Sequence, residues 1–150
     1  MNTKKFIHDT KVAMLFGMIL GDGWLSQSDY KYKDRTYKIY HLGISGDIED
    51  LKTMIADARS IWGNIGKATI YTKRTHSPKY KIEGVTNHFT MNKKVSTTFC
   101  SLGMPVGKRV RLDFSLPNWI VYADNIEIKK AFISGLYAAE GDNLLFQKKR

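Results

Sequence analysis

Two nine-residue segments of this chain align without a gap, LFGMILGDG at residues 15–23 and ISGLYAAEG at residues 133–141. Both have a small residue at the third and seventh positions and end with an acid followed by glycine. The third and seventh positions are four residues apart, so in a helix they lie on one face. Small residues there, with Gly17 in one helix and Gly135 in the other, let two helix backbones approach closely. Helical glycine costs about 1 kcal/mol relative to alanine, which close approach would offset. We therefore predict that the two helices pack against each other through these glycines.

Packing the two helices side by side would bring Asp22 and Glu140 together at the helix ends. Two carboxylates in one site repel each other unless a cation lies between them. The negative end of a helix dipole also favours a cation there. Carboxylates suit Mg²⁺, which activates water and stabilises a leaving oxygen in phosphodiester hydrolysis. The sequence thus predicts Asp22 and Glu140 as catalytic, metal-binding acids that hold Mg²⁺ or another hard divalent cation such as Mn²⁺.

Helical and strand patterns alternate along the chain. Apolar residues recur at helical spacing after Asp47 until Gly63, and aromatic or β-branched residues mark strands on either side. The expected elements are a helix over 11–20 capped by Asp9 or Thr10, a hairpin over 24–45, a helix over 48–62, a hairpin over 66–91 whose first strand covers 66–74, a short helix over 92–102 and a last helix over 125–139. This order predicts an α+β fold of the form αββαββα.

The chain is strongly basic, with 24 Lys and Arg residues against 14 Asp and Glu and a formal net charge of +10. Such an excess favours a polyanionic partner, either a nucleic acid or an anionic membrane. The longest apolar run, residues 12–20, is shorter than the roughly 20 residues of a membrane span, and no secretory or lipidation signal is visible. The single Cys100 excludes an internal disulfide. We expect a nucleic-acid partner, no membrane contact and a cytoplasmic or nucleoid-associated location.

The two repeated segments resemble the paired motifs of the LAGLIDADG homing endonucleases, the class found in inteins and group I introns. The stretches LGMPVGKR at 102–109 and LPNWI at 116–120, followed by Phe132, also look like the linker between the two motifs of such proteins. The resemblance implies a curved antiparallel sheet within the αββαββα repeat. It also implies that residues 1–124 form the first repeat with its linker and residues 125–150 the opening helix of a second, incomplete repeat.

In that family the acid of each motif binds metal ions, and the preceding residue can contribute a carbonyl oxygen. Carried over residue by residue, this implies Gly21 and Ala139 as further metal ligands beside the two acids. The sixth motif position, an aspartate in the family's name, is Leu20 in one copy and Ala138 in the other, but it is not the metal-binding position. Only nine residues follow Gly141, so we expect the second repeat to be truncated and a second copy or a separate second half to complete it.

The family places its sheet in the major groove of double-stranded DNA, where alternating side chains reach bases and phosphates. The two expected hairpins carry basic and aromatic residues that suit such contacts, although any single lysine can also belong to a solvated surface. The candidate DNA contacts are Lys31, Lys33, Arg35, Tyr37, Lys38, Tyr40, Lys67, Thr69, Tyr71, Lys73, Arg74, His76, Lys79 and Lys81. Asp47 is a helix cap that can also hold a water near the metal site.

Together these features predict a site-specific, divalent-metal-dependent endonuclease that cuts both strands of DNA at a long asymmetric or pseudo-palindromic site. Two alternatives remain open. One is a non-cleaving DNA-binding protein or a relative of RNA-splicing maturases, because basic hairpins would serve either. The other is an unrelated basic α+β domain whose repeated helix serves only core packing. His8, His41 and His88 have no ligand partner at a recognisable spacing, and we expect them to be structural.

Overall fold

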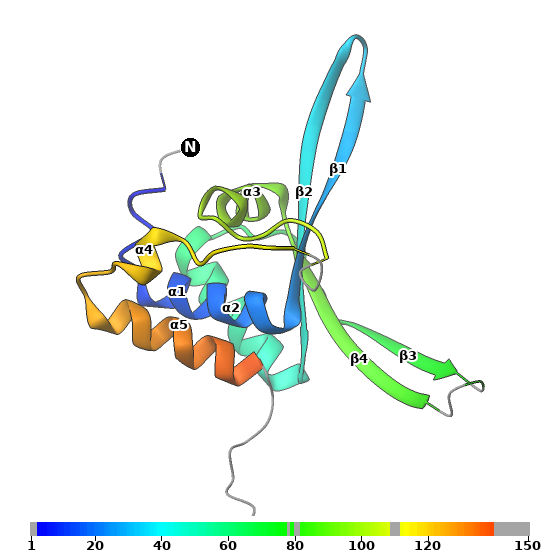
Figure 1. Ribbon diagram of the computed structural model, residues 1–150. Helices are drawn as coiled ribbons and strands as arrows, with labels where there is room; N and C mark the ends of the chain where they lie inside the picture. The colour runs from blue at the N-terminus through cyan, green and yellow to red at the C-terminus, as the bar shows by residue number, and fades with distance from the viewer. Residues whose placement is uncertain (1–2, 78, 80–81, 109–111, 140–150) are drawn as a thin grey trace, which may run out of the picture.

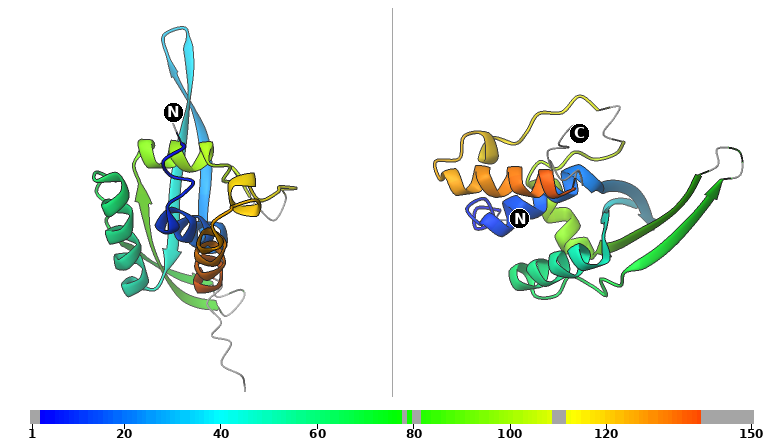
Figure 2. Two further views of the ribbon diagram at one scale, coloured as in Figure 1. Left: turned by 90° about the vertical axis from the view of Figure 1, so that its left-hand side faces the viewer. Right: turned by 90° about the horizontal axis from the view of Figure 1, so that it is seen from below.

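The computed structural model describes residues 3–77, 79, 82–108 and 112–139, in which helices pack against one four-stranded antiparallel sheet (Figure 1, Figure 2). The strand order in the sheet is β1-β2-β4-β3. In chain order the elements are α1 (Thr10–Asp22), β1 (Gly23–Tyr32), β2 (Arg35–Gly46), α2 (Ile48–Trp62), β3 (Tyr71–Ser77), β4 (Ile82–Met91), α3 (Lys93–Ser101), α4 (Asn118–Val121) and α5 (Ile126–Ala139). The predicted α+β class and the αββαββα order are confirmed, and the short α4 precedes the last helix.

Polar side chains set where the first three helices begin. Asp9 accepts hydrogen bonds from the backbone N–H groups two and three residues further on, the first at 2.8 Å. Asp47 accepts one at 2.9 Å at the start of α2, and Asn92 accepts one at 3.1 Å at the start of α3. Each bond satisfies a donor that has no partner inside the helix. Gly63 ends α2 with a φ of 70°, which glycine adopts without steric cost.

The core lies between the helices and one face of the sheet, which we call the inner face. The buried side chains of the inner face are Leu25, Leu42, Ile44, Phe89 and Met91. Phe16 of α1 is fully buried, and its ring centre lies 6.2 Å from that of Phe99 in α3 and 6.3 Å from that of Phe132 in α5. The first and last helices therefore share one core with the sheet.

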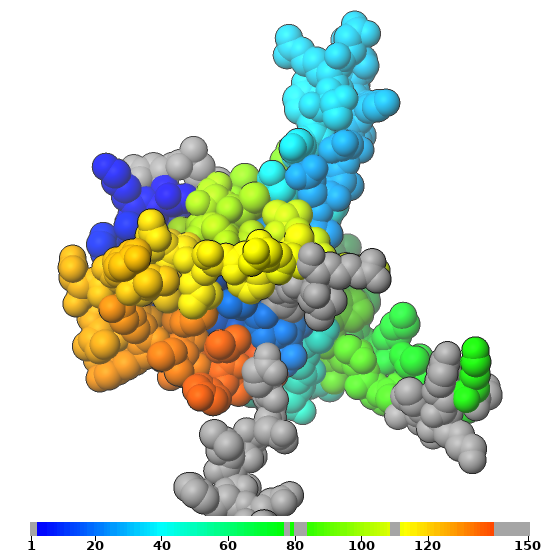
Figure 3. All heavy atoms as spheres, viewed as in Figure 1, coloured from blue at the N-terminus to red at the C-terminus, as the bar shows by residue number. Residues whose placement is uncertain are grey.

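The two hairpins share only the base of the sheet. β2 and β4 pair over residues 42–46 and 87–91, whereas β1 and β2 stay paired out to Tyr32 and Arg35. Beyond the shared base the two hairpins diverge and extend past the helices, as Figure 1 and the space-filling view in Figure 3 show. The sheet therefore curls, and the face opposite the helices, which we call the open face, is not covered by them.

The predicted strand over 66–74 is wrong in its first half, because β3 begins at Tyr71. Gly66 and Ala68 have positive φ angles of 92° and 46°, and such angles interrupt the extended backbone of a strand. The side chain of Ala68 is buried in the core. Lys67 and Thr69 are exposed but lie outside the sheet, so they share no strand face with Tyr71.

Candidate active site and nucleic-acid interface

The helices α1 and α5 lie side by side (Figure 2) and come closest at their glycines. A Cβ atom at Gly17 would overlap the carbonyl oxygen of Phe132 and lie 2.8 Å from the backbone nitrogen of Leu136. A Cβ atom at Gly135 would overlap the carbonyl oxygen of Met14. Each glycine thus faces the backbone of the opposite helix. A larger residue at either position would push the two helices apart.

The close packing continues to the carboxyl ends of the two helices. A Cβ atom at Gly21 would overlap the Cβ of Ala139, which is itself buried. Gly21 is the last residue but one of α1, and Ala139 is the last residue of α5. Asp22 follows at this junction with its side chain exposed. Its counterpart in the repeat, Glu140, follows Ala139 in the sequence and lies outside the described residues.

The junction of the two helix ends carries groups of the kind that suit a hard cation. Both helices direct the negative ends of their dipoles there, and the carboxylate of Asp22 stands beside them. Carboxylate and carbonyl oxygens are suitable ligands for Mg²⁺ and Mn²⁺. Within residues 3–77, 79, 82–108 and 112–139, no three His, Cys, Asp or Glu side chains converge on one point. The described part of the chain therefore contributes one carboxylate and helix-end carbonyl groups to such a site.

Asp47 lies just beyond the end of β2 and caps α2. Its carboxylate accepts a hydrogen bond from the backbone N–H of Glu49 at 2.9 Å. Gly23 directly follows Asp22 and pairs with Ile44 of β2. Asp47 therefore lies three residues beyond the β2 residue that is level with the helix junction. The structure shows the capping role, and the suggested role in holding a water stays a prediction.

The unbroken pairing registers assign each strand residue to one of the two sheet faces. Side chains alternate along a strand, so residues in register with buried Leu42 lie on the inner face and those in register with Gly43 on the open face. The predicted contacts on the open face are Arg35, Tyr37, Tyr71 and Lys73. Those on the inner face are Lys31, Lys38, Tyr40, Arg74 and His76. The predicted set therefore mixes residues that the strands direct to opposite sides.

Tyr40 points toward the protein rather than toward a ligand. Its side chain is half-buried against the hydrophobic core. A side-chain hydrogen bond with Cys100 of α3, the electrostatic interaction with Cys100 and burial together raise the pKa of Tyr40 above its usual value. The predicted role of Tyr40 in DNA contact is therefore corrected to a packing role.

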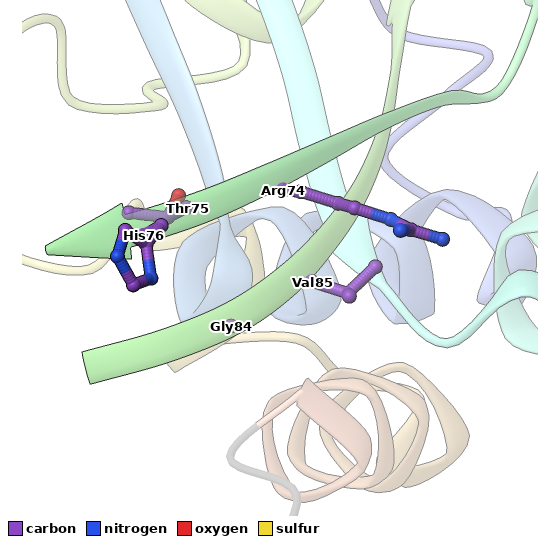
Figure 4. A pocket seen from close by; sticks show the side chains of 5 residues that line it. All are labelled: Arg74, Thr75, His76, Gly84 and Val85. Carbon is purple, nitrogen blue, oxygen red and sulfur yellow. The ribbon is translucent and has the colours of Figure 1, made fainter. Parts of the chain in front are cut away.

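Arg74 and His76 lie on the part of the second hairpin that extends past the helices. Together with Thr75, Gly84 and Val85 they line an open hollow of about 470 Å³. Figure 4 shows Arg74 and His76 projecting from β3 and Val85 from β4. Because no helix covers this part of the hairpin, both basic side chains stay exposed although they belong to the inner face.

The open face is basic. Arg35 of the first hairpin and Lys73 of the second lie on it, and His41 forms a hydrogen bond of 2.9 Å with Ser28 there. Among the strand residues that the structure describes, none on this face is an Asp or Glu; Asp29 belongs to the inner face. A basic surface without carboxylates attracts phosphate groups. The open face is therefore the candidate nucleic-acid interface.

The remaining predicted contacts lie at the hairpin tips or outside the described residues. Lys33 occupies the turn of the first hairpin with a φ of 52°, and its Nζ lies 5.5 Å from the centre of the Tyr32 ring. Lys79 is exposed between β3 and β4, and Lys81 falls outside the described residues. Each hairpin thus carries an exposed lysine at its tip.

Two further aromatic residues lie on the open face by register: Trp24, which the sequence analysis did not include among the candidate contacts, and His88, which it expected to be structural. The Trp24 ring lies over Gly43, where a Cβ atom would overlap it. The Trp24 and His88 ring centres are 5.9 Å apart, and those of His88 and Tyr71 are 5.8 Å apart. The available signal was the even spacing of Trp24 and Tyr30 along one strand, which places both on the same face.

No family model matches the chain. Curated relatives with three different names match most of it at low identity. They are "tRNA-splicing ligase RtcB" of Methanopyrus kandleri (25% identical, 91% of this chain, 13% of the relative), "DNA-directed RNA polymerase subunit Rpo1N" of Methanocaldococcus jannaschii (27%, 86% and 9%) and "Replication factor C small subunit" of the same organism (29%, 91% and 7%). The chain thus spans 13% or less of the length of these relatives.

Solved structures similar to this chain include LAGLIDADG homing endonucleases. The I-SmaMI LAGLIDADG homing endonuclease bound to cleaved DNA aligns with a TM-score of 0.35 and 16% identity over 60% of this chain and 27% of that chain. The homing endonuclease I-TnaI aligns with a TM-score of 0.34 and 13% identity over 86% and 85% of the two chains.

Proposed function

We propose that this chain is a divalent-metal-dependent endonuclease that cuts both strands of DNA at a specific site, as the LAGLIDADG homing endonucleases do. One observation carries the proposal: the two repeated helices pack backbone to backbone with their carboxyl ends adjacent. Asp22 lies at that junction, and Glu140 is the residue that follows buried Ala139. A helix pair that served only core packing would not need an acid after each small residue.

Asp22 and Glu140, together with the carbonyl oxygens of Gly21 and Ala139, would hold Mg²⁺ or Mn²⁺. When bound, such a cation supplies an activated water and offsets the charge on the leaving oxygen. The chain itself contributes two negative helix ends. Gly17 and Gly135 each contact the backbone of the opposite helix. This close contact between α1 and α5 would hold the two helix ends at a fixed separation. Fixed geometry is what a cleavage centre needs, because small displacements of the reacting groups are costly.

DNA would lie along the open face of the sheet. The hairpins diverge from a base that adjoins the helix junction, since β1 begins directly after Asp22. Arg35 and Lys73 would then contact phosphates on either side of the cleavage centre, and Lys33 and Lys79 at the tips would lengthen the contact. Phosphate contacts of this kind set the position of a protein on DNA. They also make binding weaken as salt increases.

The curated relatives favour a module that is carried inside other proteins. Their names denote three different activities, yet each matches 86–91% of this chain with only 7–13% of its own length. A segment shared by proteins of otherwise different activity is what a self-propagating element of the intein or group I intron kind would produce. The relatives therefore support the homing class more than any of their own named activities.

A plasmid assay tests the proposal. Supercoiled plasmids with random inserts are incubated with the purified chain in Mg²⁺, in Mn²⁺ or in EDTA, and the cut ends are sequenced. We expect metal-dependent nicking or linearisation at a recurring sequence and no product in EDTA. Cleavage that persists in EDTA, or binding of DNA without cleavage in either metal, would contradict the proposal.

The outer face of α5 lacks the cover that α1 has. Leu15 and Ile19 of α1 correspond in the repeat to Ile133 and Tyr137 of α5. The first two are 2% and 1% exposed, whereas the second two are 49% and 61% exposed. A separate ββαββ unit that covers α5 would bury these two side chains. A second copy of this chain is a less suitable partner for α5, because the inner face of its sheet is already covered by its own core residues.

We expect the purified chain to sediment as a monomer of 17.2 kDa and to bind an apolar-surface dye such as ANS. Ile133→Asp should reduce the dye fluorescence severalfold, because the substitution places a charge in the exposed apolar patch that Ile133 and Tyr137 form on α5. Ile48→Asp is the matched control, since Ile48 is 40% exposed at the start of α2. Sedimentation as a dimer that Ile133→Asp dissociates would instead indicate that a second copy covers α5.

A further inference from the structure

Ser28 and His41 form a polar pair on the open face of the sheet. Both side chains are exposed, and Ser28 Oγ lies 2.9 Å from His41 Nε2 in a hydrogen bond across the first hairpin. By register, both residues lie on the same face as Gly43. The sequence led us to expect a structural role for His41, but an exposed imidazole contributes little to packing. The pair is instead accessible to a ligand.

The pair lies at the edge of the sheet and near the helix junction. Ser28 belongs to β1, which is an edge strand. Gly23, which follows Asp22, is level with Ile44 of β2. His41 is three residues from Ile44 along the same strand, which is about 10 Å at about 3.3 Å per residue or about three base pairs at a rise of about 3.4 Å each. Duplex DNA on the open face would therefore meet the pair close to the proposed cleavage centre.

The open face offers His41 no acidic neighbour among the described strand residues. Besides tyrosines, which carry no charge near neutral pH, the charged and titratable side chains that these strands direct to the face are Arg35, Lys73 and His88. Arg35 lies toward the tip of the first hairpin, and the other two belong to the second. No helix covers the face (Figure 1). None of these groups can stabilise a protonated His41.

The linker approaches the same part of β1 and is also basic. The backbone N–H of Gly107 donates to the carbonyl oxygen of Leu25 at 2.8 Å, and exposed Lys108 follows Gly107. Asp29 of β1 belongs to the inner face. With positive groups around it and no acid on its face, the ring of His41 gains a partner for its charged form when an anion binds.

Protonation changes what the pair can donate. A neutral imidazole has one N–H group and a serine has one O–H group, and the hydrogen bond between them leaves one of these donors for a ligand. An imidazolium has two N–H groups, so the protonated pair keeps two donors, one on Nδ1 of His41 and one on Oγ of Ser28. A phosphate accepts both bonds, and its charge favours the protonated ring. Histidine is the side chain that ordinarily gains its charge between about pH 8 and pH 5.

We infer that Ser28 and His41 bind a phosphate of duplex DNA and that His41 takes up a proton when it does so. The edge strands of a sheet laid in the major groove lie at the walls of the groove, beside the phosphate backbone. The imidazole and one proton from solvent give an imidazolium, which pairs with the phosphate. DNA binding then strengthens as the pH falls, and the gain is lost as the pH rises and the bound imidazolium loses its proton. The inference rests on the proposed function, which places duplex DNA on the open face.

Duplex binding at two pH values tests this inference. Two labelled duplexes of about 20 base pairs, with unrelated sequences, are titrated with the chain in EDTA at one salt concentration, and fluorescence anisotropy reports binding. We expect both duplexes to bind between about 3-fold and 10-fold more tightly at about pH 6 than at about pH 8, because a pKa difference of about one unit corresponds to about 10-fold. His41→Gln should remove most of this gain and bind within about 2-fold of the parent at about pH 8, since glutamine is polar but takes up no proton.

His8→Gln is the matched control, because His8 is exposed in the segment before α1 and does not belong to the sheet. It should keep the full gain. Ser28→Ala should weaken binding at about pH 6 by between about 2-fold and 10-fold, because one donor is lost. The salt dependence gives a second readout. In the parent its log–log slope should be steeper at about pH 6 than at about pH 8 by up to about 0.9, whereas in His41→Gln the two slopes should be equal.

Circular dichroism of each variant checks that the hairpin substitutions leave the fold intact. An unchanged gain in His41→Gln, or binding at the lower pH that Ser28→Ala does not weaken, would overturn the pair as a contact. A gain confined to one of the two sequences would overturn the phosphate as its ligand. Failure of the parent chain to bind either duplex would overturn the inference as well.

Plasmid cleavage by the parent chain separates this inference from the proposed function. Metal-dependent cleavage together with an equal gain in the parent and in His41→Gln would overturn the inference and leave the endonuclease proposal intact. A gain that His41→Gln removes, in a chain that binds DNA but never cuts it, would support the inference and overturn the endonuclease proposal.

Discussion

Asp22→Asn is expected to slow metal-dependent DNA cleavage by at least about 1000-fold, because a bound cation supplies several kcal/mol of transition-state stabilisation. Asparagine keeps the size of the side chain but removes the charge that attracts the cation. Asp22 is exposed at the last residue of α1, so the core is not disturbed. Removing a negative charge from a helix carboxyl end should leave the melting temperature unchanged or slightly higher. Plasmid cleavage rates and thermal unfolding measure the two effects.

Asp50→Asn is the control for the loss of one negative charge, because Asp50 is an exposed acid in the first turn of α2. It should cleave at the parent rate. Glu140→Gln should lose cleavage as Asp22→Asn does, since each acid ends one copy of the repeat. Cleavage that continues at the parent rate in both variants would show that the helix junction is not the catalytic centre.

Gly17→Ala is expected to destabilise the protein by about 3 kcal/mol, near the upper end for overpacking a tight contact. Alanine has the higher helix propensity by about 1 kcal/mol, so propensity alone predicts the opposite sign. The added methyl group would overlap the carbonyl oxygen of Phe132, which belongs to the backbone and cannot rotate away. The helices must then separate, and cleavage should fall with stability because the helix ends move. Urea denaturation measures the change in the free energy of unfolding.

Gly84→Ala is the matched control, because a Cβ atom at Gly84 would have no neighbour within 4 Å. Its free energy of unfolding should stay within about 0.5 kcal/mol of the parent value. A Gly17→Ala variant as stable as the parent would mean that α1 and α5 do not pack backbone to backbone. In that case the reason for placing Asp22 at a shared site would also be lost.

Helix starts could be predicted because capping is local. Asp9, Asp47 and Asn92 each bond a backbone N–H within three residues, so the information lies in a short stretch of sequence. The start of β3 could not be predicted in this way. Ala68 has a positive φ and a buried side chain, and this conformation depends on its packing against distant parts of the chain. The strand pattern of residues 66–74 did not indicate this backbone conformation at Ala68.

The amino-acid sequence by itself determined the element order, the glycine positions in the repeated helices and the acids that follow them, because these depend on local spacing. Only the tertiary structure decided which side chains of each strand face outward. Alternation is visible in the sequence, but its phase is set by which residues the helices bury, and a shift of one residue reverses every side chain. For this reason Tyr37 lies on the open face while Tyr40 packs inward. The contact between Trp24 and His88 likewise required the strand order, which pairs β2 with β4.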